Sequence, residues 1–325
     1  MAWLAIGAIV VVVAAITLPL VLLGSSSPPS HLSVQEGSHS PQVKLSSATL
    51  LKLPSASAVV EHGGSAWVTD DLRDLLLAFD PSTGKVEHSI HLAGRPVAMV
   101  LAGGHLWVTD AVDNQVVEVD PATLLVQRSL PVPAEPTSMA VLNGDVWVTS
   151  LADNEVTPID VQNGTAGTPV GVLAGAVRVA AGFGSLWVTG TTDLLTRVTP
   201  AAGGSGAGAT QQKTVTVGQD PIGVATGADA VWVANSADGT VSKVSPTSVT
   251  VPQTIRVGGD PLALGVSGGD VYVGDGTAQT VRTVWPAPGS KTLGIGTDPR
   301  ALLPVSAGVW VAASNPGRVL AVAPS

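Results

Sequence analysis

A short pattern centred on an aromatic ring recurs seven times along the chain and limits the folds that this sequence can adopt. The seven aromatic positions are separated by 40, 40, 40, 45, 40 and 38 residues. They are Trp67, Trp107, Trp147, Trp187, Trp232, Tyr272 and Trp310. A fixed period of this length predicts a repeat architecture, in which each unit buries its apolar surface against its neighbours.

The second repeat shows what one unit contains. Between residues 96 and 132, four short runs rich in β-branched residues are separated by turn residues. Gly103 and Gly104 separate the first two runs, where positive φ is expected. The Asp120-Pro121 pair separates the last two, as a type I turn prefers. Each unit is therefore predicted to be a four-stranded antiparallel meander.

Seven such units predict an all-β fold, a seven-bladed β-propeller. The one long interval coincides with a glycine/alanine tract at 201–210, which is predicted to be an inserted loop. The last unit reaches Ser325 after only three strands, whereas Ala48–Pro54 matches a fourth-strand segment ahead of the first unit. The N-terminal strand is therefore predicted to complete the last blade and to cover its open edge.

The repeats also carry a family resemblance. Residues 218–261 resemble the YVTN-type repeats of bacterial propellers and are similar to the NHL-like and virginiamycin B lyase-like groups. The resemblance covers residues 45–325. It implies the propeller fold and leaves the function open, because such repeats occur in enzymes, ligand sensors and protein-binding scaffolds.

An uncharged apolar run precedes the repeats. Ala2 to Leu23 supplies 22 residues, roughly 33 Å as a helix, against a bilayer core of about 30 Å. No Lys or Arg precedes the run, and it is longer than the apolar region of an ordinary signal peptide. Residues 1–24 are predicted to be a transmembrane anchor or uncleaved signal, with a cleaved signal as the alternative. A Ser/Pro-rich linker at 25–44 and the propeller at 45–325 follow.

Composition restricts the compartment and the partners. The chain has no cysteine, which excludes disulfides, thiolate metal sites and cysteine nucleophiles. A net charge of −9 with only 15 Lys and Arg argues against nucleic acid as a partner. The first basic residue is Lys44, so the charge bias of the flanks does not orient the membrane segment. The anchor, the linker and the cysteine-free β domain together favour the extracytoplasmic side of a bacterial cytoplasmic membrane.

The aromatic residues are interpreted as structural groups. Because the seven repeat positions share one register in the second strand, their rings are predicted to fill the space between neighbouring blades. Trp3 belongs to the membrane segment, and Trp285 stands outside the register without an assigned role.

The loops that lead into the first strand of each unit hold the candidate binding residues. In propellers the innermost strand borders the central channel, so these loops are expected to ring its mouth, where ligands commonly bind. The alternative is that an Asp before Pro only caps a turn. The candidates are Arg95, Glu135, Arg178, Asp220, Asp260, Asp298 and Arg300.

No catalytic residue, metal ligand or cofactor is predicted. Acidic and amide residues after the aromatic strand are interpreted as turn-forming, since their spacing does not fit a calcium loop. If one unit bound a cation, Asp110 to Asn114 would be the preferred place. All six histidines lie at or before His105, and His88 and His91 are expected to face solvent. The resemblance to the lyases implies His and Glu in later blades, and this chain has no histidine there.

The favoured prediction is a membrane-anchored extracytoplasmic propeller that binds a small molecule, a glycan or a protein and performs no chemistry. Such a module would serve as a sensor or a scaffold. The alternative is a lyase or hydrolase that uses the Asp/Arg rim at the channel mouth. A third possibility is a purely structural scaffold in an envelope complex.

Overall fold

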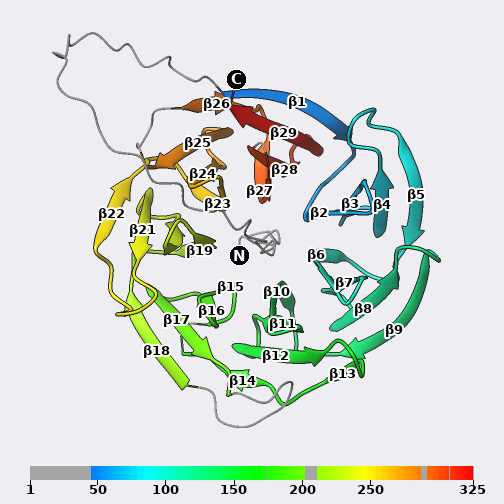
Figure 1. Cartoon of the computed structure of the whole chain (residues 1–325), viewed down its shortest axis with the longest axis horizontal. Helices are drawn as coiled ribbons and strands as arrows, with labels where there is room; N and C mark the ends of the chain where they lie inside the picture. Colours follow the sequence, from blue (N-terminus) through cyan, green and yellow to red (C-terminus); the bar gives the residue numbers. More distant parts are fainter. Residues whose placement is uncertain (1–44, 174, 202–210, 287–290, 307, 325) are drawn as a thin grey trace, which may run out of the picture.

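The computed structural model describes residues 45–173, 175–201, 211–286, 291–306 and 308–324. The predicted membrane segment, the linker and nearly all of the glycine/alanine tract lie outside these residues. The described chain forms seven antiparallel sheets arranged as blades around a common axis (Figure 1). Within the described ranges, no helix is long and apolar enough to cross a membrane. The predicted all-β, seven-bladed propeller is confirmed.

The strands follow one order in every blade, from the axis outwards. Blade 1 has β2 (Val59–His62), β3 (Ser65–Asp70), β4 (Leu75–Phe79) and β5 (Val86–His91). Blade 2 has β6 (Pro96–Ala102), β7 (His105–Asp110), β8 (Gln115–Asp120) and β9 (Leu125–Pro131). Blade 3 has β10 (Pro136–Leu142), β11 (Asp145–Ser150), β12 (Glu155–Asp160), β13 (Thr165–Ala166) and β14 (Val170–Gly171). Blade 4 has β15 (Arg178–Gly182), β16 (Ser185–Thr189), β17 (Leu194–Thr199) and β18 (Gln211–Thr216).

The remaining blades repeat this order. Blade 5 has β19 (Pro221–Gly227), β20 (Ala230–Asn235), β21 (Thr240–Val244) and β22 (Gln253–Arg256). Blade 6 has β23 (Pro261–Ser267), β24 (Asp270–Asp275), β25 (Thr280–Trp285) and β26 (Thr292–Gly294). Blade 7 has β27 (Asp298–Val305), β28 (Gly308–Ser314), β29 (Arg318–Pro324) and, as its outer strand, β1 (Leu45–Lys52).

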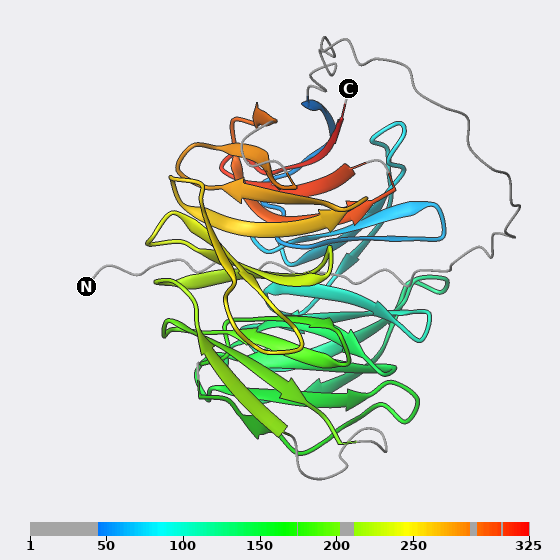
Figure 2. The same ribbon diagram turned by 60° about the vertical axis from the view of Figure 1, so that its left-hand side comes forward.

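The N-terminal strand closes the ring, as the sequence predicts. β1 runs antiparallel to β29 from Leu45 opposite Pro324 to Lys52 opposite Arg318. The blue and red strands lie side by side in Figures 1 and 2. The backbone N–H of Leu53 then donates to the Gly317 carbonyl at 3.2 Å. The edge of the C-terminal strand is thereby paired instead of exposed.

Local turn chemistry explains why each unit folds back on itself. Gly103 and Gly104 adopt φ of 59° and 82° between β6 and β7, which confirms the expected positive φ. Between β8 and β9, Asp120 Oδ1 accepts the backbone N–H of Ala122 at 2.8 Å, and Oδ2 accepts the Thr123 hydroxyl. These bonds hold the predicted Asp-Pro turn and set the register of the outer strand.

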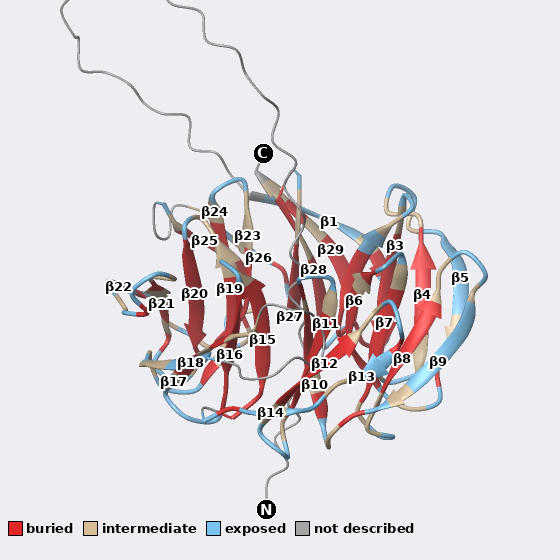
Figure 3. Cartoon of the chain, turned by 60° about the horizontal axis from the view of Figure 1, so that its bottom comes forward, coloured by how far each residue is buried: buried red, intermediate tan, exposed pale blue. Residues whose placement is uncertain are grey.

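Burial falls from the second and third strands towards the outer strand, as Figure 3 shows. β7 is buried from Leu106 to Asp110, whereas β9 is exposed over most of its length. Blade 3 departs from four unbroken strands, because its outer strand is split into β13 and β14 around Gly167 and Pro169. Proline lacks the N–H that a continuous ladder needs, so the interruption falls on the edge strand.

Candidate functional site

The first strands of the blades surround the axis of the ring (Figure 1). Each of them contacts the first strands of the two adjacent blades. The loop that leads from the fourth strand of one blade into the first strand of the next is called a rim loop, and the end of the ring that carries these loops is the rim face. This arrangement gathers the candidate binding residues at one end of the ring.

Backbone hydrogen bonds fix four rim loops to the end of the neighbouring hairpin. The carbonyl before the strand-initial proline accepts an N–H from the residue that follows the second strand, at 2.9–3.0 Å. The pairs are Arg95 with Ala111, Glu135 with Leu151, Asp220 with Ser236, and Asp260 with Gly276. The candidate residues therefore occupy equivalent backbone positions in four blades.

Two of these residues adopt left-handed backbone conformations. Glu135 has a φ of 56° and Asp220 a φ of 52°. The following proline disfavours the right-handed helical region for both, and Asp is among the side chains that tolerate the left-handed one. Both side chains are exposed, as is Arg95.

The acidic candidates form two separate arrangements. Asp220 and Asp260 lie in rim loops of adjacent blades, and partial desolvation of the largely exposed Asp220, followed by the charge of Asp260, raises the pKa of Asp220. Asp260 also accepts the hydroxyl of Ser236. Asp298 accepts the Gln279 amide at 2.9 Å and the Asn315 amide at 2.9 Å, so blades 6 and 7 hold it between them.

The basic candidates differ in how far they are buried and in the blade that carries them. Arg178 is 3% exposed on β15, and Arg300 is half-buried on β27. Burial, followed by the charge of Arg300, lowers the pKa of Arg178 to about 9. Arg300 Nε donates to the Ser314 hydroxyl at 2.8 Å. Arg178 and Arg300 thus lie on first strands of blades 4 and 7, while Arg95 lies on the rim loop of blade 2.

In the structure, acids and bases predicted at the channel mouth bond to different partners: Asp298 to Gln279 and Asn315, and Arg300 to Ser314. Ser236 links the two rim-loop acids, since its backbone N–H donates to the Asp220 carbonyl and its hydroxyl donates to the Asp260 carboxylate. Neither Arg95 nor Arg300 forms an ion pair with any carboxylate of the described ranges. The sequence alone did not indicate these partners.

Some of the acidic and amide residues after the aromatic strands hold their own turns, whereas Asn114, Asp153 and Asp238 accept backbone N–H groups of rim loops. Asp110 Oδ1 accepts the N–H groups of Val112 and Asp113, and Oδ2 accepts the Gln115 amide at 3.0 Å. Asp275 pairs with Arg282 at 2.6 Å. In the part of the chain that the structure describes, no group of three or more His, Asp or Glu could hold a metal ion.

The repeat aromatic residues lie between blades. Trp107 is fully buried in an apolar cluster with Met139 and Val148 of blade 3, and Trp187 shares a cluster with Val224 of blade 5. Trp310 alone among the seven is only half-buried. Three indole N–H groups also donate to the carbonyl at the end of the preceding strand, a contact that sequence reasoning missed. They are Trp107 to Ala102, Trp187 to Gly182 and Trp232 to Gly227.

Trp285, which the sequence left without a role, lies against blade 5. Its ring centroid is 5.5 Å from that of Trp232, and the Lys243 ammonium lies 3.7 Å from the Trp285 centroid. Lys243 is the cross-strand partner of Trp232, so the ammonium is held over both rings. This group packs blade 5 against blade 6 away from the rim loops.

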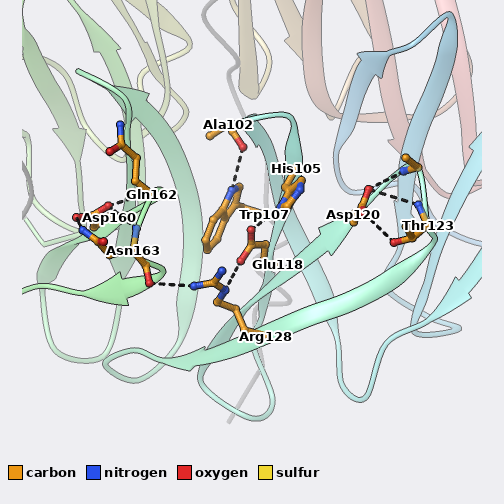
Figure 4. Close-up of polar contacts among 11 residues, drawn as sticks. Ala102, His105, Trp107, Glu118, Asp120, Thr123, Arg128, Asp160, Gln162 and Asn163 are labelled. Atoms are coloured by element: carbon orange, nitrogen blue, oxygen red, sulfur yellow. Dashed lines mark hydrogen bonds and ion pairs between the residues drawn. The ribbon is translucent and has the colours of Figure 1, made fainter.

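A buried carboxylate on blade 2 is a second polar feature that the sequence did not reveal. Glu118 is 3% exposed and contacts His105 Nδ1 and Arg128 Nε, each at 2.5 Å (Figure 4). Arg128 continues to the Asn163 carbonyl of blade 3 at 3.0 Å. The cluster joins two blades at the outer strands. His88 and His91 are exposed, as expected.

Comparisons with known proteins establish the fold and nothing finer. No family model matches the sequence, and no curated protein matches it. The chain is similar to a streptogramin B lyase structure, with a TM-score of 0.74 and 14% identity over 86% of this chain and 98% of the other. It is also similar to U3-55K, with a TM-score of 0.70, 10% identity, and 86% and 98% coverage. Hydrazine synthase from Kuenenia stuttgartiensis gives a TM-score of 0.61, 12% identity, and 90% and 99% coverage. These identities support the propeller fold alone.

Proposed function

We propose that this chain is a membrane-anchored, extracytoplasmic β-propeller that binds a small molecule, a glycan or a protein on its rim face without converting it. The observation that supports this proposal is the concentration of charged side chains on rigid positions of the rim. Asp220, Asp260 and Asp298 lie in or beside rim loops of three consecutive blades, and Arg178 and Arg300 lie on first strands. Charged groups on loops held by a stable scaffold are typical of binding sites. The resemblance to YVTN- and NHL-type repeats belongs to the same proposal.

The direction of the chain supports a tethered arrangement. Lys52 is the end of β1 that continues towards the rim loop before β2, so Leu45 lies at the other end of blade 7. The point at which the preceding residues join the propeller therefore lies on the face opposite the rim. If residues 2–23 span the bilayer, this attachment leaves the rim face free to meet partners.

A second function, a lyase or hydrolase, is favoured by one specific observation. The raised pKa of Asp220 is the kind of shift that general acids and bases show. The likeness to a streptogramin B lyase structure points the same way. The sequence has no histidine after His105, however, whereas the resemblance to the lyases implies His and Glu in later blades. Binding without chemistry is therefore the better supported function.

The two functions are separated by one experiment on the full chain in detergent. Thermal unfolding is screened against metabolites and glycans, because a ligand that binds the folded state raises the apparent stability. Each hit is then incubated with the protein and recovered for mass spectrometry. We expect ligands that raise Tm, lose this effect in Asp260→Asn or Asp298→Asn, and are recovered unchanged. Conversion of the ligand, with a pH-rate profile that Asp220→Asn abolishes, would establish the enzyme instead.

A further inference from the structure

The three most exposed large apolar side chains of the described residues all lie on the rim face. Leu72 is 69% exposed in the turn between β3 and β4, and Val112 is 63% exposed in the turn between β7 and β8. Leu173 is 78% exposed in the rim loop that leads into β15. The turns between second and third strands lie at the same end of the ring as the rim loops, so all three side chains point out from one face.

Hydrogen bonds connect these loops into one surface along four consecutive blades (Figure 1). The rim loop at 92–95 is bonded to the turn of blade 1 through the Asp74 carbonyl and to the turn of blade 2 through the Ala111 N–H, at 2.9 and 3.0 Å. The next rim loop is bonded likewise to the turns of blades 2 and 3, and the loop that begins at Val172 is bonded to the turn of blade 3. We call this surface the blade 1–4 rim. It comprises residues 71–74, 92–95, 111–114, 132–135, 151–154 and 172–173.

A comparison between repeats shows that the fold does not require these apolar side chains. Leu72 and Val112 both lie five residues after the repeat aromatic residue, a position that is exposed in every blade. Its equivalents in the other five blades are Ala152, Thr192, Ala237, Thr277 and Asn315. Leu173 follows the apolar residue that begins each rim loop, and its equivalents in blades 2, 3, 5, 6 and 7 are Ala93, Pro133, Gly218, Gly258 and Gly296. Departures from a local rule without a structural benefit are expected at functional sites, and large apolar side chains exposed on one face mark interaction surfaces.

The same surface is acidic. Its two basic residues are Arg73, which pairs with Asp70 at 2.7 Å, and Arg95. Asp113 and Glu135 are exposed and form no ion pair with any residue of the described ranges. Unpaired charges of one sign around apolar contacts attract a partner of the opposite sign. The carboxylates of the blade 1–4 rim are those of Asp71, Asp74, Asp113, Glu135 and Asp153.

We propose that the blade 1–4 rim docks a polypeptide segment in which lysine or arginine residues lie beside large apolar residues. Leu72, Val112 and Leu173 would bury apolar side chains of the partner, and the carboxylates between them would bind its cations. Small-molecule sites are concave and apolar-lined, whereas these side chains project from the tips of loops. The phosphates of nucleic acid or of a lipid surface would be repelled by the carboxylates. This inference rests on the proposed function, because it names the class of partner that the rim face binds.

The test selects binders without assuming a partner. The full chain in a non-ionic detergent is presented to a random peptide library displayed on phage, and synthetic copies of the enriched peptides are titrated by fluorescence anisotropy. Leu72→Thr and Val112→Thr introduce the residue that blades 4 and 6 carry at this position. Asp113→Asn and Glu135→Gln remove charges that no ion pair of the described ranges uses.

Two matched controls make the same changes away from the rim face. Leu125→Thr alters a leucine that is 61% exposed on the outer strand β9. Glu61→Gln removes an exposed carboxylate near the opposite end of blade 1. All six variants should keep the Tm of the wild type, because each replaced side chain is exposed.

We expect the enriched peptides to combine Lys or Arg with Leu, Ile, Val or Phe. Their affinity should fall ~5-fold in Leu72→Thr and in Val112→Thr, since each removes part of a buried apolar contact. Asp113→Asn and Glu135→Gln should slow association and reduce its dependence on salt, because charges at the edge of an interface steer the encounter. Leu125→Thr and Glu61→Gln should bind as the wild type does.

Three results would overturn the inference. One is a selection that enriches no peptide, or enriches peptides without basic residues. Another is an affinity that neither Leu72→Thr nor Val112→Thr changes. The third is a large loss of Tm in both of these variants, which would assign the two side chains a structural role. A metabolite or glycan that raises Tm, needs Asp260 and is indifferent to Leu72 and Val112, with no peptide enriched, would leave the proposed binding function intact.

Discussion

The strand that closes the ring makes a quantitative prediction. Leu51 lies on β1 opposite Val319 and is only 8% exposed. It belongs to an apolar cluster that also contains Val68 of blade 1 and Tyr272 of blade 6. Truncating Leu51 should therefore weaken the packing at the junction where the two ends of the chain meet.

The expected cost follows from burial. Leu→Ala at buried positions costs about 2–5 kcal/mol, and Leu51 should lie near the lower end because an outer strand relaxes more easily. At about 2 °C per kcal/mol for a large domain, Leu51→Ala should lower Tm by about 4 °C. The matched control is Leu125→Ala on β9, also an outer strand, where the leucine is 61% exposed. That change should stay within about 0.5 kcal/mol.

Both variants are compared by thermal and urea unfolding of the full chain in detergent. Equal stability of Leu51→Ala and Leu125→Ala would refute the reasoning, because it would mean that β1 does not take part in the cooperative unit.

Three further predictions concern other parts of the molecule. Gly317→Ala should destabilise the protein, because its new Cβ would overlap the Leu53 carbonyl, whereas Gly294→Ala meets nothing within 4 Å and should be neutral in the same unfolding assay. Asp220→Asn should raise stability slightly at pH 7, because the raised pKa of Asp220 means that folding disfavours its charged form. The gain in stability should disappear when the pH falls below 3.8, the ordinary pKa of Asp. Tm measured across a pH series checks this, and a gain that does not change with pH would contradict it. If residues 2–23 span the membrane with the propeller outside, protease added to spheroplasts should cut the 25–44 linker and release the propeller. A chain starting at residue 43 should fractionate with soluble proteins. Protection of the propeller from protease in spheroplasts would contradict that orientation.

The parts of the structure that could be predicted from sequence are those encoded locally or by the repeat. The seven aromatic positions fix the number of blades, and Gly103-Gly104 and Asp120-Pro121 fix turns within a few residues of themselves. The closing strand was predictable because a missing fourth strand at one end matched a surplus strand at the other. Its observed bounds begin three residues earlier than the matched segment.

The parts that could not be predicted depend on contacts between distant segments. The position of Arg300 depends on the bulge between Pro299 and Ala301, and the hydrogen bond from Gln279 to Asp298 joins blades 6 and 7. The contact of Glu118 with Arg128 is local, between paired residues of β8 and β9, but it depends on a register shift beside Glu118. A comparison of equivalent positions across the repeats would have singled out Leu72 and Val112, because each replaces a small or polar residue.

Hydrogen exchange of the full chain, with and without a ligand that raises its Tm, tests most directly whether the rim face is the binding surface. We expect amides of the rim loops, such as 217–220 and 257–260, to become protected while the hairpin turns at 103–104 and 143–144 at the opposite end do not change. Protection confined to those opposite turns or to the outer strands would contradict the account.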